Sequence, residues 1–400
     1  MRPRLLPLLL LLAFFTPGLK AEDKTLRLGL GDPARKDRQV SVTLDAVTDT
    51  RDGALLTPAE MAARLAGARL VLVGESHTEM DFHRAQLRVI EELARSGREV
   101  FVGLEMYPYT QQAYLDQWVN GLLTEEGFLR LSRWYEHWGY HWDYYRDIFL
   151  FARDHKVRLF AVNAPRAVVT QVRKQGFASL TPEQAAHIPQ DVDTTSADHR
   201  TLFKSYFEAD DPLHSGMTEE QWNGMISAQA TWDATMAHNA VKALGEHGGP
   251  NTVMVVLVGS GHVVYGLGIA RQAAAHGFEG RIATVVPVNV KEADGTPIEK
   301  VQATYADFVW GLPQAAGPLY PSTGLSTAAD TLKAILVAEK SPAEKAGFKT
   351  GDLLLALDGT PLPDKEALNR LMAGKRWGDS AVFTVERGAE KVEVRVVFRR

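Results

Sequence analysis

The stretch VLVGESHTEMDFH, residues Val71–His83, places polar and chemically active side chains directly after an apolar run. The run Val71–Val73 predicts a buried strand, and Gly74 permits a sharp turn out of it. Glu75 and His77 then stand where the strand ends. At a single strand end such polar residues more often simply begin a loop, so other strand ends must decide whether they form a site.

The same pattern returns at VLVGSGH, residues Val256–His262, so the chain carries two apolar runs that each end in Gly-x-x-His. Two further apolar runs end at Glu105 and at Asn163, and Arg166 follows the latter. Ligands of an open parallel sheet bind beyond the carboxyl ends of its strands. We therefore expect the four strand ends to form one site.

The fold class follows from the alternation of apolar runs with helical patterns. Strands are predicted at 68–74, 98–105, 157–163, 252–259 and 281–288, and helices at 57–67, 79–97 and 262–277. This order predicts an α/β fold, in which a mostly parallel sheet carries helices on both faces. A long helical insertion is expected between the strands at 157–163 and 252–259.

Composition excludes several classes of function. The chain has 400 residues, enough for two domains, and it contains no cysteine. Disulfides, thiolate metal sites and a cysteine nucleophile are therefore excluded. A formal net charge of −5 gives no basic footprint for nucleic acid.

Residues 1–21 read as a secretory signal peptide, with two arginines before the apolar run Leu5–Phe15. The run is too short to span a bilayer. Because there is no cysteine to carry a lipid, we expect an exported, periplasmic protein.

The C-terminal part is predicted to be a separate module. A Gly-, Pro- and Ser-rich stretch at 311–326 reads as a linker. Beyond it, residues 327–400 contain SPAEKAG, a following GD and a DG turn, and in this they resemble a PDZ domain. The resemblance implies a groove for a protein C-terminus. Residues 332–340 are expected to supply the receiving strand, and Ala367, Leu368 and Leu371 the opposite wall.

The residues 22–310 before the linker resemble the ChaN-like haem-binding uptake family of the Tiki/TraB superfamily. The motifs that carry this resemblance are GESHTEMDFHRAQ, GLEMY, NAPR, QATWDATMAHNAV and GSGHVVYGLGIA, which lie within about residues 55–290. The resemblance implies a haem- or iron-associated exported protein. We favour a haem-binding protein of iron acquisition with a homodimer among its candidate partners, and the sequence leaves open whether two protomers share haem. A metal-dependent hydrolase ranks second and a pure PDZ scaffold third.

The first interpretation of the site is a divalent metal, such as zinc, manganese or iron. His77 and His262 with Glu75 or Glu105 would be its ligands, and the metal would supply hydroxide near neutral pH. The carboxylates could equally act as general bases without a metal. The resemblance to the Tiki/TraB superfamily implies that this would be hydrolase chemistry, of a peptidase or an esterase.

The second interpretation is haem at the same edge, with an axial tyrosine or histidine. Tyr107, Tyr109 and Tyr140 are the candidate tyrosines. The stretch 133–151 contains three Trp and four Tyr and would form an aromatic wall, although packing in the core would explain it as well. Asn163 and Asp233 are further candidates for contacts with the cofactor.

Two charged residues receive specific roles. Arg166 would bind an anion, either a haem propionate or a developing oxyanion, or else pair with Glu105. Asp233, on a predicted helix that also carries Gln229, would orient a site histidine. His83 is a weaker candidate for the site. The histidines expected at the surface are His155, His187, His199, His214, His247 and His276.

Overall fold

The computed structural model describes residues 24–207, 216–328 and 331–400. The predicted signal peptide lies outside these residues. The described chain falls into two compact units, the larger ending at Gly317. The segment Arg133–His141 groups with Pro318–Arg400 in the smaller unit. Among the described residues, no helix combines the length and apolarity that crossing a membrane requires.

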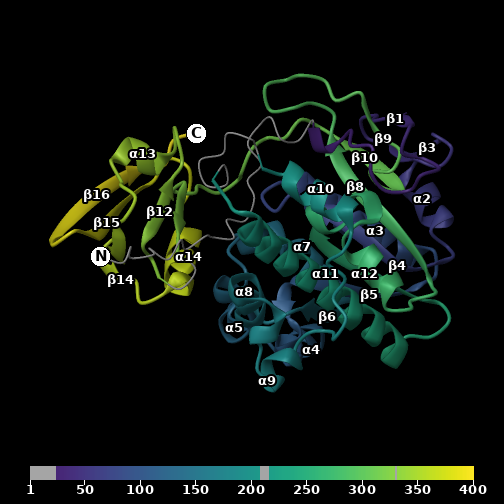
Figure 1. Cartoon of the computed structure of the whole chain (residues 1–400), viewed down its shortest axis with the longest axis horizontal. Helices are drawn as coiled ribbons and strands as arrows, with labels where there is room; N and C mark the ends of the chain where they lie inside the picture. The colour runs from purple at the N-terminus through teal and green to yellow at the C-terminus, as the bar shows by residue number, and fades with distance from the viewer. Residues whose placement is uncertain (1–23, 208–215, 329–330) are drawn as a thin grey trace. The chain divides into compact units, whose positions relative to one another are not determined.

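The larger unit is built on one eight-stranded sheet, with strand order β3-β2-β10-β8-β4-β7-β5-β6 (Figure 1). Its strands are β2 (Val47–Asp49), β3 (Leu55–Leu56), β4 (Ala68–Glu75), β5 (Glu99–Pro108), β6 (Arg158–Asn163), β7 (Thr252–Gly259), β8 (Arg281–Asn289) and β10 (Phe308–Leu312). All pairings from β10 to β6 are parallel, and β2 and β3 are antiparallel additions. The predicted α/β class with a mostly parallel sheet is confirmed, although β10 was not predicted. A separate two-stranded sheet pairs β1 (Gln39–Ser41) with β9 (Lys300–Gln302).

Helices cover both faces of this sheet. Leu70 and Leu72 of β4 belong to a hydrophobic core with Met236 of α11 (Glu219–His247) and with residues of α12 (Ile269–Ala275). Successive side chains of a strand point to opposite faces, so the buried Val71 and Val73 face the other side. There α3 (Met80–Arg95) packs on β4 and β5.

Two helical insertions carry the chain between core strands. Between β5 and β6 lie η1 (Tyr109–Gln111), α4 (Gln112–Val119), α5 (Glu125–Leu131), α6 (Trp134–His137), η2 (Trp142–Tyr144) and α7 (Arg146–His155). Between β6 and β7 lie α8 (Arg166–Gln175), η3 (Phe177–Ser179), α9 (Pro182–Ala185), α10 (Ala197–Ser205) and α11. The second insertion is the predicted one. Before β4, α2 (Pro58–Arg64) has the expected capping box between Thr57 and Glu60.

The helix predicted at 262–277 is much shorter in the structure. Two short 3₁₀ turns, η4 (Ser260–His262) and η5 (Val264–Gly266), precede α12. Tyr265 and Gly266 both have positive φ, of 61° and 67°. Because right-handed helix requires negative φ, the helix cannot begin until after these residues.

The smaller unit has the predicted mixture of strands and helices. Its elements are β11 (Leu325–Thr327), β12 (Ala334–Val337), α13 (Pro342–Ala346), β13 (Leu353–Leu357), β14 (Thr360–Pro361), α14 (Lys365–Ala373), β15 (Ser380–Arg387) and β16 (Glu390–Val397). Strands β15 and β16 form the predicted hairpin around Gly388. Phe383 and Phe398 are fully buried in its core. Strands extend into both ends of the predicted linker, because β10 ends at Leu312 and β11 begins at Leu325.

Candidate functional site

The carboxyl ends of the two Gly-x-x-His strands lie side by side. Glu75 at the end of β4 is paired with Gly259 at the end of β7, in parallel register. The amide of Gly259 donates a 2.7 Å hydrogen bond to Glu105 Oε2 from β5. The sheet therefore brings the ends of β4, β7 and β5 to one edge.

Glu75 is the centre of one buried cluster at this edge. Its Oε1 accepts a hydrogen bond from Tyr145 at 3.0 Å and lies 2.6 Å from His77 Nδ1. Its Oε2 lies 2.8 Å from Nδ1 of His83, which is also buried. Burial opposes the charged carboxylate, but His83 and His77 outweigh it and hold the pKa of Glu75 well below its usual range. The pKa of His77 is raised in return: burial lowers it, and the Glu75 carboxylate raises it by more.

Asp233 of α11 is the centre of a second buried cluster. His262 Nδ1 lies 2.6 Å from Asp233 Oδ1, and His199 Nε2 lies 3.6 Å from Asp233 Oδ2. The amide of Gln229 lies 2.9 Å from His262 Nδ1. Burial would lower the pKa of His262, but Asp233 and then Glu105 raise it to about 10. The two carboxylates therefore favour the protonated form of the His262 imidazole.

Glu105 lies between the two clusters. His262 Nε2 is 3.4 Å from Glu105 Oε1. One donor atom each from Glu75, His77 and Glu105 lie within 4.8 Å of one another, close enough to share a single cation. His262 turns Nδ1 to Asp233, which is outside this set of three and holds the orientation of the ring.

Gly259 is required where the two clusters meet. A Cβ at this position would lie 3.1 Å from His77 Cε1 and 3.7 Å from Glu105 Oε2. Its φ of −53° and ψ of 138° suit any residue, so the constraint is space rather than backbone conformation.

Asn163 and Arg166 occupy the neighbouring end of β6. The Asn163 amide donates to the Glu105 carbonyl at 2.8 Å, and its Oδ1 accepts from the Ala164 amide at 2.8 Å. Arg166 is the exposed first residue of α8. The predicted roles of Arg166, as an anion-binding residue or as a partner of Glu105, stay predictions.

The predicted tyrosines lie in three different environments. Tyr107 is fully buried and bonds Ser132 Oγ at 2.6 Å, and burial raises its pKa, so the structure places it in the core rather than at an iron site. Tyr109 is half-buried just beyond β5, and its hydroxyl lies 2.7 Å from His187 Nδ1. Tyr140 belongs to the smaller unit, where its ring packs near Trp138 with centroids 5.4 Å apart.

The aromatic stretch 133–151 packs mainly in the core. The ring of Trp142 packs against those of Trp118, Phe128 and Phe149, and Phe149 also packs against Phe128, with centroid distances from 4.8 to 6.2 Å. The wall interpretation is therefore wrong for these residues. Tyr145 is different, since its hydroxyl reaches Glu75.

Sequence reasoning missed several members of the site. His199 was expected at the surface, but it is only 2% exposed and contacts Asp233. His187, also expected there, is half-buried and bonds Tyr109. His155, His247 and His276 are exposed as predicted, and His214 lies outside the described residues. Only the helical insertions bring His187 and His199 to the edge, and no local pattern marks them.

By its fold and site, the larger unit is an α/β domain that holds imidazoles and carboxylates at the carboxyl edge of its parallel strands. The family model for haem-binding uptake proteins, Tiki superfamily, ChaN, matches residues 61–272, more than half of the chain. The chain belongs to this family. A PDZ domain model matches residues 322–397, so the smaller unit contains a PDZ domain.

Among solved structures, ChaN of Campylobacter jejuni, described as showing cofacial heme binding, has a TM-score of 0.52 at 19% identity. The match covers 66% of this chain and 95% of that chain, and it establishes a shared fold. The HtrA-type protease AlgW with a decapeptide matches with a TM-score of 0.19 at 20% identity, over 20% of this chain and 29% of that one. A mutant of the erythromycin esterase EreC matches with a TM-score of 0.40 at 12% identity, over 70% of this chain and 98% of that one. These last two TM-scores are too low to establish a shared fold. A search of curated proteins found no significant match.

Proposed function

We propose that this protein binds haem at the carboxyl edge of β5 and β6, with Tyr109 as the axial ligand. The observation that carries the proposal is the 2.7 Å contact between the Tyr109 hydroxyl and His187 Nδ1. A tyrosine binds ferric haem iron as the phenolate. A neutral imidazole beside the hydroxyl can take the proton that the phenol loses.

Arg166 supplies a second feature that suits haem. Pro108 and Asn163 are register partners on β5 and β6, so Tyr109 and the turn to Arg166 leave the sheet at the same corner. A cation at the first residue of a helix opposes the helix dipole, and an anion beside it would relieve that conflict. A propionate is such an anion, and the guanidinium can bind it with two parallel hydrogen bonds.

The family description names haem-binding uptake, and we infer from it that the bound haem serves iron acquisition. We infer that the chain acts outside the cytoplasm, because residues 1–21 have the pattern of a signal peptide. The predicted homodimer stays a prediction. Sedimentation of the protein with and without haemin would test it.

The proposal is tested by titrating the purified protein with haemin and following the Soret band. The intact protein should give a saturable shift, and Tyr109→Phe should weaken binding at least about tenfold, since it removes the axial oxygen. Tyr114→Phe is the matched control, because Tyr114 is also half-buried and lies on the next helix. Equal affinity of the two variants would contradict the assignment of Tyr109.

A second candidate function, metal-dependent hydrolysis, is favoured by the cluster of Glu75, His77 and Glu105. Their donor atoms lie within 4.8 Å of one another, and the set of one imidazole and two carboxylates suits zinc, manganese or iron. A bound ion would activate water near neutral pH. His262 would hold a proton beside Glu105, at the 3.4 Å contact described above, where a leaving group could receive it.

Metal analysis separates this candidate from haem binding. If the second function is right, the protein should retain about one divalent ion per chain after dialysis, and His77→Ala should lose it. Glu105→Gln should weaken binding of the ion but leave the haemin titration near normal, because the variant keeps Tyr109 and Arg166. A protein that binds haemin and retains no ion would exclude the hydrolase.

We further propose that the PDZ domain binds the C-terminus of a partner protein at β11. The predicted receiving strand, β12, pairs with β11 on one side, and on the other its first residue, Ala334, exchanges 2.7 Å hydrogen bonds with Asp352 and Gly351. Among the described residues β11 has β12 as its strand partner, and Gly324 precedes β11 with φ of 76°. A peptide would therefore add beside β11. Pull-down with peptides of free and amidated C-termini tests this, since only the free carboxylate should bind.

A further inference from the structure

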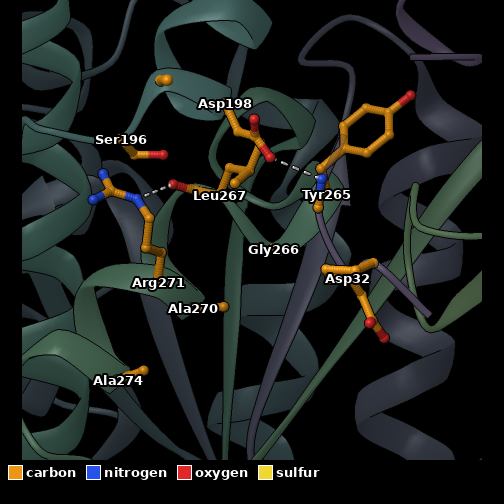
Figure 2. A pocket seen from close by; sticks show the side chains of 12 residues that line it. Asp32, Ser196, Asp198, Tyr265, Gly266, Leu267, Ala270, Arg271 and Ala274 are labelled. Atoms are coloured by element: carbon orange, nitrogen blue, oxygen red, sulfur yellow. Dashed lines mark hydrogen bonds between the residues drawn. The ribbon is translucent and has the colours of Figure 1, made fainter. Parts of the chain in front are cut away.

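A hollow of about 530 Å³ lies in the larger unit, and it opens to solvent (Figure 2). Its walls come from the loop before β1, the start of α10, the turn η5 and one side of α12. The lining residues are Gly31, Asp32, Pro33, Ser196, Ala197, Asp198, Tyr265, Gly266, Leu267, Ala270, Arg271 and Ala274. None of them belongs to the two carboxylate clusters or to the Tyr109 corner, so the hollow is separate from the site described above.

A smaller and more enclosed cavity, of about 100 Å³, adjoins this hollow. The two share Asp32, Tyr265, Gly266 and Ala270 as lining residues. Thr304 also lines the small cavity and is only 4% exposed. Its hydroxyl has no hydrogen-bond partner within the described part of the chain. A buried hydroxyl without a partner is costly, which indicates that a ligand group meets it there.

The charges around the two cavities favour a cation. The Arg271 guanidinium is neutralised by Asp193 and also donates to the Leu267 carbonyl at 2.8 Å. Arg35, on the small cavity, is shared between Asp32 at 3.0 Å and Asp307 at 3.2 Å. Both arginines are therefore occupied, and carboxylates outnumber them.

Asp198 provides the carboxylate that remains available. Its Oδ2 accepts the Gly31 amide at 3.2 Å, and no hydrogen bond to its Oδ1 is found among the described residues. In Figure 2 the Asp198 side chain stands beside the hollow, and Arg271 and Ala270 line another wall. The rest of that surface includes the apolar side chains of Pro33, Leu267 and Ala274. A carboxylate next to apolar side chains suits a charged group on a short hydrocarbon chain.

We propose that the hollow and the adjoining cavity together bind a small aliphatic amine. An ammonium group donates to Asp198 Oδ1, the Thr304 hydroxyl accepts a hydrogen bond from an amine N–H, and the carbon chain lies on the apolar wall. A diamine fits best, because each cavity offers its own acceptor. This binding does not depend on the proposed haem site.

Isothermal titration of the full chain with 1,4-diaminobutane tests the proposal. Saturable binding is expected, and butane-1,4-diol of the same length should not bind. Asp198→Asn should weaken binding of the diamine roughly tenfold, because it removes the negative charge. Asp154→Asn is the matched control, since Asp154 is exposed on α7 and pairs with its neighbour Arg153.

Thr304→Val separates ligand binding from a structural role. Because the hydroxyl has no partner within the described residues, its loss should leave the melting temperature unchanged or raise it. The same variant should weaken binding of 1,4-diaminobutane about threefold or more. A lower melting temperature, unchanged diamine affinity, or equal binding of the diol would each overturn the proposal.

Discussion

At the scale of single residues, the buried carboxylate of Asp233 favours the positive charge of the His262 imidazole. Its own pKa is lowered, since burial raises it less than His262 and His199 lower it. His262 in turn keeps its second proton up to a pKa of about 10, against an ordinary value of 6.5. Proton binding to His262 and stability are therefore linked.

This linkage predicts how stability changes with pH. A histidine whose pKa is higher in the folded state stabilises fully below the unfolded value of 6.5, and loses that contribution as pH rises to about 10. The free energy of unfolding in urea should thus fall between pH 6.5 and 10. In Asp233→Asn the fall should be smaller, and stability at pH 6.5 should drop by about 3 kcal/mol. An unchanged slope in the variant would contradict the role of Asp233.

Gly259 allows a second test at the same scale. Gly259→Ala places a methyl group 3.1 Å from His77 Cε1, and the ring must move away. We expect a loss of about 2 kcal/mol in unfolding free energy, together with a shifted His77 imidazole resonance. Gly249→Ala is the control, because its methyl would lie 3.9 Å from the nearest neighbour, Thr252 Oγ1. Equal effects of the two changes would show that His77 is not constrained by Gly259.

Residues of the site could be predicted where they directly follow a buried strand. Glu75, His77, Glu105 and His262 meet at the edge because parallel strands end on the same side of a sheet. His83 and Tyr145 also contact Glu75, but they come from helices whose rotation the sequence does not specify. Their contact with the site depends on packing across the whole domain.

At the scale of elements, Asn163 joins the ends of β5 and β6. It hydrogen bonds the Glu105 carbonyl through Nδ2 and the Ala164 amide through Oδ1. Asn163→Ala loses both hydrogen bonds and should cost about 2 kcal/mol of unfolding free energy, and Asn163→Asp should cost more, because it places a carboxylate oxygen against the Glu105 carbonyl oxygen. Haemin affinity should fall in the same order, because Tyr109 and Arg166 follow these strand ends.

The control for this series is Asn120→Ala, at the exposed C-terminal end of α4. Thermal unfolding and haemin titration on the same samples give both quantities. If haemin affinity stayed constant while stability fell, the corner of β5 and β6 would not be the binding surface.

The core strands were predictable because their apolar runs are long enough to be buried on both faces. The helix after His262 was not, since the left-handed backbone at Tyr265 delays its start to Ile269. Nor was the strand β11 predictable, since it has three residues and a half-buried pattern. Short strands carry too few residues to show an alternation.

At the scale of the whole molecule, the two units should be separable in function. Tyr109, His187, Arg166 and both carboxylate clusters belong to the larger unit. Deleting everything after Gly317 should leave the haemin titration unchanged and abolish capture of C-terminal peptides. Loss of haemin binding in the truncated protein would show that the PDZ domain contributes to the haem site.

The most direct test of the central claim is resonance Raman spectroscopy of the haemin complex. With Tyr109 on the iron, the spectrum should contain bands of an iron-bound phenolate. These bands should vanish in Tyr109→Phe and persist in Tyr114→Phe. A complex that lacks phenolate bands, or one that keeps them in Tyr109→Phe, would contradict the proposed haem site.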